Sequence, residues 1–588
     1  MNLPNTNQQY FSDSVKINKK NQITNSGFSR IKLVTLWGLI IVGYFLFVVQ
    51  WYSISNFQGS INADNNELST GWGAAFFKYA PNPLVSGSLN WTITLGRAGG
   101  SILAGWLIAK VGHKYAVITV LSLMVLSFPF LIVCQNADWN ALSIAGNAPI
   151  SSEGVAAAGM TLFVIFRIFL AIGGTTLITY TNSIIAKMDS SDKAKFMTVN
   201  QFGFNGGALI ANIFFVIPSA FAAVNGNPSI WTGILSSFVV LVFIILILYL
   251  MYGIEIVPKD LNKKLQKNSD QLTFGSVFKE KDTLILGSMF IIWLISVVFI
   301  SSSTIRTFVE QSPANFRALA IDNALNPNVK NINSSQYYWV WPAFICLFVS
   351  GFFVGLFSLG SFSKTIFERK FYIRFMFAMG YVCMLISLLC GYLGGYDNSA
   401  ALAFMLIFIF FSGFFLWSVQ PALLTIPQQL IKTNAKYMGI VAGLIWGIGY
   451  FGYTIGEIFM SSLTSFVNPF NNFAGNFVAI GGEIHQKLLN NNLNYNAALE
   501  EYNKLISNPN LALAQMKLSE TSGTIASIVV YWIILFTIFP LTFFLPKSGY
   551  WNKDNEFVIF NEKWKPFFNI NHWKINNKEY LISTYSLK

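Results

Sequence analysis

Residues 230–254 read IWTGILSSFVVLVFIILILYLMYGI, a run without a charged side chain. A helix needs about 20 apolar residues to cross the hydrocarbon core of a bilayer, and this run is long enough. Backbone N–H and C=O groups find no water in that core and must pair within the segment, which favours a helix. The stretch therefore predicts a transmembrane helix.

Similar runs recur along the whole chain of 588 residues. Hydrophobic residues make up 54% of the sequence and charged residues 11%, too little charge to cover the surface of a soluble protein. The fold class expected is an all-α integral membrane protein with twelve transmembrane helices in two sets of six. The expected helices cover 33–57, 85–109, 115–134, 160–185, 198–222, 230–254, 283–305, 338–362, 372–394, 400–428, 438–463 and 523–546.

The distribution of charge predicts an orientation. With the N-terminus in the cytoplasm, the inner segments carry 29 Lys and Arg residues and the outer connections carry seven. Basic residues are retained on the cytoplasmic side, so this bias predicts a multi-pass plasma-membrane protein with both termini inside. The net charge of +13 then needs no nucleic-acid partner, because inner basic segments face anionic membrane lipid.

The connections between the helices suggest domain boundaries. An amphipathic pattern from Ile484 to Ile506 predicts a helix that caps the outer mouth, although an unconstrained insertion explains it equally. The outer loops and the tail are candidate contacts for partners of a protein that we expect to be monomeric. The predicted parts are an N-terminal tail (1–32), a first half (33–254), a central cytoplasmic loop (255–282), a second half (283–546) with outer loops at 306–337 and 464–522, and a C-terminal tail (547–588).

The two predicted halves contain a short repeat. Ala194-Lys195-Phe196-Met197 opens the fifth expected helix, and Ala435-Lys436-Tyr437-Met438 opens the eleventh. Glycine-rich helices follow both motifs at equivalent places in the six-plus-six layout. Repeated halves with a binding site between them are a recurrent architecture of transporters.

The connection between the second and third expected helices carries a recognisable motif. It reads Gly105-Trp106-Leu107-Ile108-Ala109-Lys110-Val111-Gly112-His113-Lys114. A second motif, an arginine followed by spaced glycines, lies in the fourth expected helix at Arg167, Gly173 and Gly174. Together with the topology, these motifs resemble the signatures of the major facilitator superfamily of transporters.

The resemblance implies a function for the first motif. Gly105, Lys110, Gly112 and Lys114 would form the gating loop between the halves. Ala109 stands where the family has an acidic residue that latches the two halves, so latching here must weaken or use other groups. By the same resemblance, Arg167 occupies a position tied to coupling or charge balance.

Three charged residues lie clearly inside the expected helices, and each needs a reason because charge in a membrane is costly. Arg97 is a candidate anchor for a carboxylate or phosphate, or a structural cation bound to carbonyls or to Glu457. Arg167 is either a substrate contact or a structural or gating arginine. Glu457 is a candidate proton carrier for coupling, or it reaches water, or it neutralises an arginine. His113, His485 and His572 fall in loops or the tail, so no metal cluster or cofactor site is indicated.

Several uncharged residues complete the candidate substrate site. Asn205 and Asn212 are seven residues apart on one helix and share a face that would border a wet cavity. Trp417, Gln420 and Pro421 lie in the middle of the tenth expected helix, and Tyr44 in the first is a further aromatic candidate. Substrate-binding candidates are thus Arg97, Arg167, Tyr44, Asn205, Trp417 and Gln420, although single aromatic residues also serve as packing.

The sequence thus favours a secondary active transporter without enzymatic activity. Two buried arginines and one buried acid favour a small anionic substrate, such as a phosphate ester or carboxylate, moved by alternating access between the halves. Exchange with a counter-anion needs no proton carrier, whereas proton symport needs Glu457. Two alternatives stay open: a sensor or assembly protein that keeps the fold without transport, and a membrane-embedded transferase.

Overall fold

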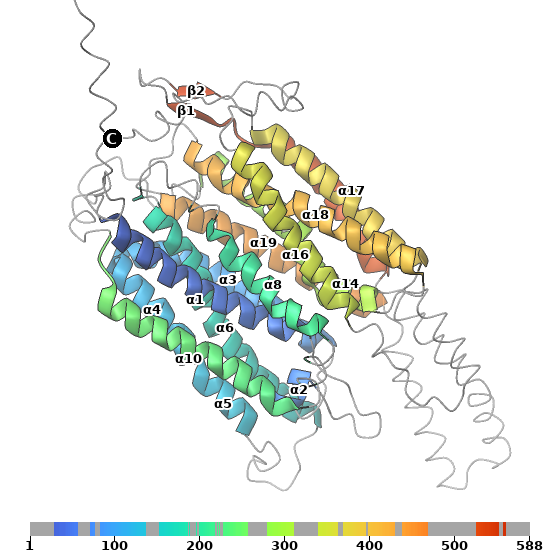
Figure 1. Ribbon diagram of the computed structural model, residues 1–588, viewed down its shortest axis with the longest axis horizontal. Coiled ribbons are helices and arrows are strands. Elements are labelled where there is room, and N and C mark those ends of the chain that lie inside the picture. The colour runs from blue at the N-terminus through green and yellow to red at the C-terminus, as the bar shows by residue number, and fades with distance from the viewer. Residues whose placement is uncertain are drawn as a thin grey trace, which may run out of the picture.

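The structure is a computed structural model of the whole chain, and helices make up most of it (Figure 1). The description below is confined to residues 29–56, 71–76, 83–136, 152–185, 187–188, 196, 199–217, 220, 223, 227–256, 279–310, 339–362, 369–394, 398–429, 438–467, 525–551 and 557–559.

The first half of the chain folds into a group of packed helices, called here the first group. A helix lies on each of the six ranges expected from the sequence, and residue Ser127 alone separates two helices that together make one span, His113–Cys134. The helices are α1 (Arg30–Asn56), α2 (Gly71–Phe76), α3 (Pro83–Val111), α4 (His113–Leu126), α5 (Phe128–Asn136), α6 (Ser152–Ile185), α8 (Phe202–Val216) and α10 (Pro228–Tyr252).

The second half forms a corresponding second group. Its helices again lie on the six expected ranges, and the last of these is the final span, Ile525–Phe544. The prediction of twelve helical segments is therefore confirmed. The remaining elements are α13 (Lys281–Val297), η2 (Phe299–Ser301), α14 (Ser303–Glu310), α16 (Val340–Phe362), α17 (Arg369–Gly394), α18 (Ser399–Thr425), η3 (Ile426–Gln429), α19 (Met438–Val467) and η4 (Phe539–Phe544), the last turn of the final span.

A small β-sheet follows the final span. Strand β1 (Gly549–Trp551) pairs antiparallel with β2 (Phe557–Ile559), with Tyr550 opposite Val558. The sheet is an addition to the all-helical class predicted from composition, and it lies at the end of the bundle in Figure 1.

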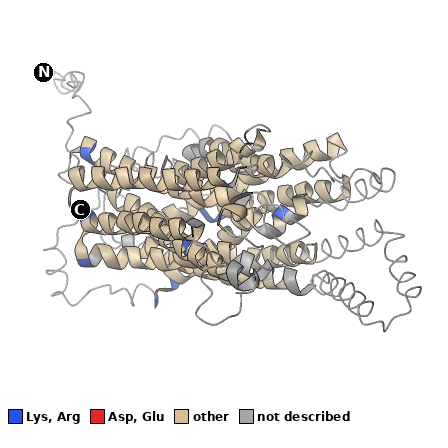
Figure 2. Cartoon of the chain, turned by 90° about the horizontal axis from the view of Figure 1, so that it is seen from below, with Lys and Arg blue, Asp and Glu red and all other residues tan. Residues whose placement is uncertain are grey.

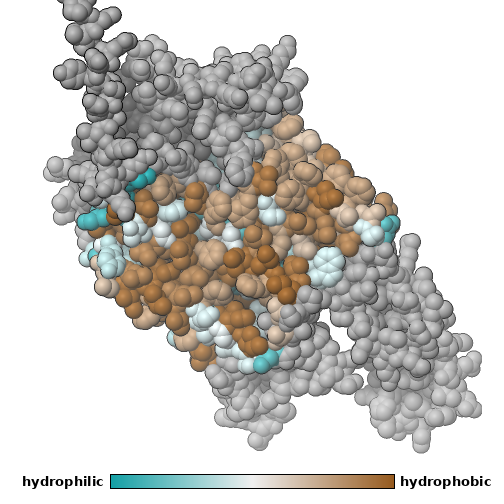
Figure 3. All heavy atoms as spheres, viewed as in Figure 1, coloured by the Kyte–Doolittle hydropathy of each residue, from teal (hydrophilic) through white to brown (hydrophobic). Residues whose placement is uncertain are grey.

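The exterior of the helices is what a lipid environment requires. Eight of the described helices are long and apolar enough to cross a membrane, and α8 and α16 are shorter apolar helices. Large apolar side chains such as Met251, Phe214 and Phe404 are exposed on the outside, and Figure 3 shows a mostly brown face. Lys, Arg, Asp and Glu colour little of the helical body in Figure 2. Lipid tails can solvate such a surface, whereas water cannot.

The two groups meet chiefly along two helix pairs, α3 with α19 and α8 with α16, and α6 also touches α19. Glycines permit the first contact: a Cβ atom on Gly443 would lie 2.8 Å from the backbone oxygen of Ser101, and Gly447 faces Ile102 and Ala98. In Figure 1, α1, α4 and α10 lie on one side of this boundary, and α16, α17 and α18 lie on the other. The glycine-rich sequence of α19 thus allows two helix backbones to approach closely.

Several sequence predictions lie outside the described residues. These are the amphipathic stretch from Ile484 to Ile506, nearly all of both four-residue repeat motifs, most of the N-terminal tail and central loop, and most of the two long outer loops and the C-terminal tail.

Candidate functional site

Arg97 is completely buried at the boundary between the two groups. Glycines on either side of it bring α3 against α6: Gly96 lies next to Ala171, and a Cβ atom on Gly100 would lie 2.9 Å from the backbone oxygen of Ile172. Gly99, by contrast, points into open space, with nothing within 4 Å of its Cβ position. The helix thus packs closely on one side and holds the guanidinium group inside the protein.

Aromatic side chains surround the Arg97 guanidinium. Its Nη2 donates a hydrogen bond to the Tyr44 hydroxyl oxygen at 3.2 Å. Its central carbon lies 4.2 Å from the ring centroid of Tyr450 on α19 and 4.6 Å from that of Trp51 on α1, with Phe47 and Phe204 at 5.8 and 5.6 Å. A cation is attracted by the negative faces of such rings, most strongly where water is excluded. Helices of both groups therefore contribute to this cage.

The guanidinium retains unused hydrogen-bonding capacity. Among the described residues, Nε and Nη1 have no hydrogen-bond partner, although both atoms are buried. The alternative that Arg97 binds Glu457 is not what the structure shows, because Glu457 interacts with Arg167 instead. A planar cation with free N–H donors matches the geometry of a carboxylate or phosphate.

Trp417 joins the Arg97 cage to the second group. It lies 5.3 Å from Phe204 of α8 and 5.5 Å from Trp293 of α13, measured between ring centroids. The Trp293 indole N–H donates to the backbone oxygen of Leu416 at 3.0 Å. The rings continue from Trp293 through Phe290 (5.2 Å), Trp446 (4.5 Å) and Tyr450 (5.5 Å) back to Arg97. Aromatic side chains of four helices, α8, α13, α18 and α19, thus form a closed circuit with Arg97.

The predicted amides of α8 and α18 are buried rather than exposed to a cavity. Asn205 and Asn212 donate to carbonyl oxygens of their own helix, at Gln201 (3.2 Å) and Ala208 (2.7 Å), and their side-chain oxygens have no partner among the described residues. The Gln420 side-chain oxygen is also buried without a described partner. Pro421 follows it inside α18 and removes a backbone donor at that point. The expected wet face is not seen in this conformation.

A second polar cluster lies between α3, α6 and α19. Glu457 is 5% exposed, which rules out the interpretation that its carboxylate reaches water in this conformation. The positive charge of Arg167 attracts the Glu457 carboxylate, and the Thr94 hydroxyl is within hydrogen-bonding reach of that carboxylate. The Thr454 hydroxyl lies 2.7 Å from that of Thr94 and links the two groups. Arg167 retains Nε and Nη2 without a described partner, and Glu457 retains Oε2.

The predicted gating loop forms a tight turn between α3 and α4. Gly112 has a φ of +86°, a conformation that favours glycine. The backbone N–H groups of His113 and Lys114 donate to the two carboxylate oxygens of Glu255, at 2.6 and 3.2 Å. This carboxylate at the end of α10 therefore caps the start of α4, within the first group. It does not replace the latch between halves that an acid at position 109 would supply.

Two further residues of this loop differ from the sequence-based expectation. His113 was expected in a loop, but it is the first residue of α4 and is buried, with Nε2 3.3 Å from the Tyr180 backbone oxygen and Nδ1 3.4 Å from the Tyr249 hydroxyl. The Lys110 ammonium lies over the Trp106 ring of its own helix at 4.6 Å. Gly105 is buried and lies near Gly443 of α19, so it belongs to the contact between the groups.

The structure adds residues to the site that motif searching missed. Helical spacing from two predicted residues could have found some of them: Phe47 and Trp51 follow Tyr44 at i+3 and i+7, and Trp446 and Tyr450 precede Glu457 by eleven and seven residues. Within the part of the chain that is described, no group of three His, Cys, Asp or Glu side chains could hold a metal ion.

The helical fold and the buried charges between two helix groups define a multi-pass membrane protein with a polar centre. The chain belongs to the Mycoplasma MFS transporter family. The sequence model of that family matches residues 163–465, more than half of the chain. This confirms the resemblance to the major facilitator superfamily. The matched region contains Arg167, Asn205, Trp417, Gln420 and Glu457, whereas Arg97 and Tyr44 lie before it.

Individual proteins support the same assignment. The chain is 29% identical over 493 residues to a Mycoplasma genitalium major facilitator superfamily transporter, covering 74% of this chain and 84% of that protein. It is 27% identical over 481 residues to a Mycoplasma pneumoniae protein of the same name, covering 72% and 84%.

Solved structures include similar chains as well. One is a D-xylose-proton symporter, with a TM-score of 0.44 and 15% identity, covering 73% of this chain and 90% of that one. Another is the major facilitator superfamily transporter FucP in the outward conformation, with a TM-score of 0.45 and 13% identity, covering 88% and 100%.

Proposed function

We propose that this chain is a secondary active transporter that moves a small anion, such as a phosphate ester or carboxylate, across the plasma membrane. The two helix groups would be the two halves that rock against each other, with both termini in the cytoplasm. The observation that carries the proposal is the Arg97 guanidinium, a buried cation at the boundary of the groups with two N–H-bearing atoms that have no described partner.

The contacts of Arg97 suggest how binding and rocking are linked. Tyr450 belongs to the second group and contacts the guanidinium at 4.2 Å, whereas Tyr44 and Trp51 belong to the first. Separation of the groups on one side would withdraw Tyr450 and leave the guanidinium exposed on that side. An anion would then replace the ring, because it can accept charge-assisted hydrogen bonds from Nε and Nη1, which the ring leaves unpaired. Closure on the opposite side would release it.

Uptake into proteoliposomes tests the substrate class. We expect a labelled phosphate ester or carboxylate to enter and a neutral sugar not to enter. Arg97→Gln should abolish uptake, while Arg97→Lys keeps the charge but loses the planar fork and should retain part of it. Uptake of the neutral solute alone, or anion uptake that is unchanged in Arg97→Gln, would contradict the proposal.

Thermal stability separates this function from a purely structural arginine. An arginine at the centre of a membrane costs about 2.5–3.5 kcal/mol on insertion scales, so Arg97→Gln should melt no lower than the wild type if the residue serves binding. Bound substrate should raise the melting temperature of the wild type and leave that of the variant unchanged. A variant that melts far lower and still responds to substrate would identify Arg97 as structural.

Glu457 is the proposed carrier of a coupling proton. Its carboxylate is buried, lies near Arg167 and Thr94, and retains one oxygen without a described partner. Protonation would weaken its attraction to Arg167 and free α19 to move relative to α6. Glu457→Gln should therefore lose uptake driven by a proton gradient and keep exchange of internal for external substrate. Equal loss of both, or retention of proton-driven uptake, would exclude this role.

A further inference from the structure

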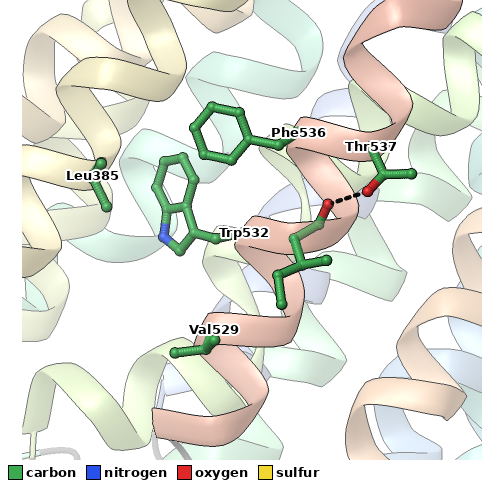
Figure 4. Close-up of a pocket in the computed structure, with 6 residues that line it drawn as sticks. Leu385, Val529, Trp532, Phe536 and Thr537 are labelled. Carbon is green, nitrogen blue, oxygen red and sulfur yellow. Dashed lines mark hydrogen bonds between the residues drawn. The ribbon is translucent and has the colours of Figure 1, made fainter.

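A groove on the outer surface of the second group lies between α17 and the final span (Figure 4). Its volume is about 490 Å³. One side is Leu385 of α17, and the final span supplies the rest: Val529, Trp532, Ile533, Phe536 and Thr537. The Thr537 hydroxyl donates to the Ile533 carbonyl of its own helix, so the lining offers mainly hydrocarbon and ring surface.

The groove opens toward the bilayer rather than toward the centre of the protein. Val529, Ile533 and Phe536 are each more than half exposed, and they belong to a helix long enough to cross a membrane. An apolar surface at this position is solvated by lipid tails. The groove therefore suits an acyl chain, and the remaining question is what holds one particular lipid there.

Positive charge lies at one end of the line of contact between α17 and the final span, called here the seam. Arg374 lies eleven residues before Leu385 on α17, about three helical turns, so both side chains are on one face of the helix. Phe543 lies eleven residues after Trp532, and the Arg374 guanidinium lies over its ring at 4.1 Å. The groove and this contact thus lie along one line where α17 meets the final span.

The separation along this line matches the dimensions of one lipid. Eleven residues of α-helix rise about 16 Å, and one leaflet contributes about half of a hydrocarbon core of roughly 30 Å. A headgroup at the level of Arg374 therefore places its acyl chain along the seam as far as the groove.

Further basic residues of the same two segments lie near this end. Lys370 lies one turn before Arg374 on α17, and the exposed Lys547 follows the final span four residues after Phe543. Neither α17 nor residues 525–551 contain an Asp or Glu in their sequence. A negatively charged headgroup is therefore favoured over a zwitterionic one.

We propose that this seam is a binding site for one anionic phospholipid. Its phosphate lies against Arg374, Lys370 and Lys547, and one acyl chain occupies the groove beside Trp532 and Leu385. The proposal does not depend on the transported substrate, because the site is on the outside of the second group.

Native mass spectrometry of the full-length protein in detergent tests the charge requirement. Phosphatidylglycerol and phosphatidylcholine with identical acyl chains are titrated separately. We expect a single phosphatidylglycerol to bind, and its affinity to fall roughly thirtyfold in Arg374→Gln/Lys547→Gln, from the loss of two basic residues near a lipid surface. Equal binding of both lipids, or unchanged affinity in the double variant, would overturn the site.

The groove is tested independently with a lipid that carries bromine on its acyl chains. Bromine quenches nearby tryptophan fluorescence, and the difference between the wild type and Trp532→Phe reports on this position. Leu385→Trp fills the groove and should displace the lipid, whereas Val240→Trp on the exposed face of α10 is the control. Free phosphate should not compete, which distinguishes a lipid from a soluble anion. Binding that persists in Leu385→Trp, or quenching unrelated to Trp532, would contradict the proposal.

Discussion

A single methyl group at the contact between α3 and α19 should change the conformational equilibrium of the whole protein. Gly443 lies in the contact between the two groups on this pair of helices, and its missing side chain faces the backbone oxygen of Ser101. Gly443→Ala adds a Cβ atom that would lie 2.8 Å from that oxygen. Backbone atoms cannot rotate away as the end of a side chain can, so the two helices must separate.

The size of the effect follows from this distance. Ordinary contact begins at 3.4 Å, so the helices must move apart by about 0.6 Å. Overpacking of this kind typically costs about 1–3 kcal/mol. The cost applies only to the conformation in which α3 and α19 touch, and it therefore shifts the balance between conformations by roughly 5- to 150-fold.

Distance measurement by electron paramagnetic resonance checks this expectation. Spin labels at Tyr115→Cys and Lys281→Cys report on the two groups at the end of the bundle that carries the gating loop; both positions are exposed, and the native cysteines are replaced. We expect Gly443→Ala to increase the population with the longer distance. Gly456→Ala is the matched control on α19, because its Cβ would lie 3.7 Å from Ile295, an ordinary contact.

Two results would refute the reasoning. One is a distance distribution in Gly443→Ala that equals that of the wild type. The other is an equal shift in Gly456→Ala, which would trace the effect to helix propensity rather than to the contact. Gly100→Ala completes the comparison, because its Cβ would press on Ile172 inside the first group. That variant should lower the melting temperature and leave the distance between the groups unchanged.

Three further predictions concern stability. Glu255→Ala removes the acceptor for the His113 and Lys114 N–H groups and should cost about 1 kcal/mol of stability, measured as a lower melting temperature. Glu280→Ala should leave the melting temperature unchanged, since that side chain makes no cap on α13. Gly413→Ala presses a Cβ onto the Phe348 backbone oxygen and should abolish the folded peak in size-exclusion chromatography, whereas Gly233→Ala has open space and should keep it. Trp293→Phe loses the hydrogen bond to Leu416 and should lower the free energy of unfolding by about 1 kcal/mol, measured by thermal unfolding. Trp106→Phe, at a half-exposed position, should change it by no more than about 0.5 kcal/mol.

The helical segments could be predicted because the bilayer imposes a local rule. An apolar run of sufficient length must be a helix whatever it contacts, so residues 230–254 were expected and Pro228–Tyr252 is found. Arg97, Arg167 and Glu457 stood out for the same reason, since any charge within such a run is costly. Resemblance of two short motifs, supported by this topology, was enough to indicate the family.

The partners of these charged residues could not be predicted. Arg97 was open to interaction with Glu457, and the structure instead places it among Tyr44, Trp51 and Tyr450, which the linear sequence spreads over α1 and α19. Glu457 was open to water, and helix packing buries it near Arg167. Asn205 and Asn212 of α8 were expected beside a wet cavity, and in this conformation they are enclosed.

The sequence by itself determined that the chain crosses a membrane as helices, which charges lie within them, and which family it belongs to. Each of these properties depends on composition within one segment or on a short motif. Only the tertiary structure decided that the Arg97 guanidinium is shared between aromatic rings of both groups and that glycines of α19 set their contact. Those features depend on how helices distant in the sequence pack together, and packing is governed by the shapes of whole surfaces that no single segment specifies.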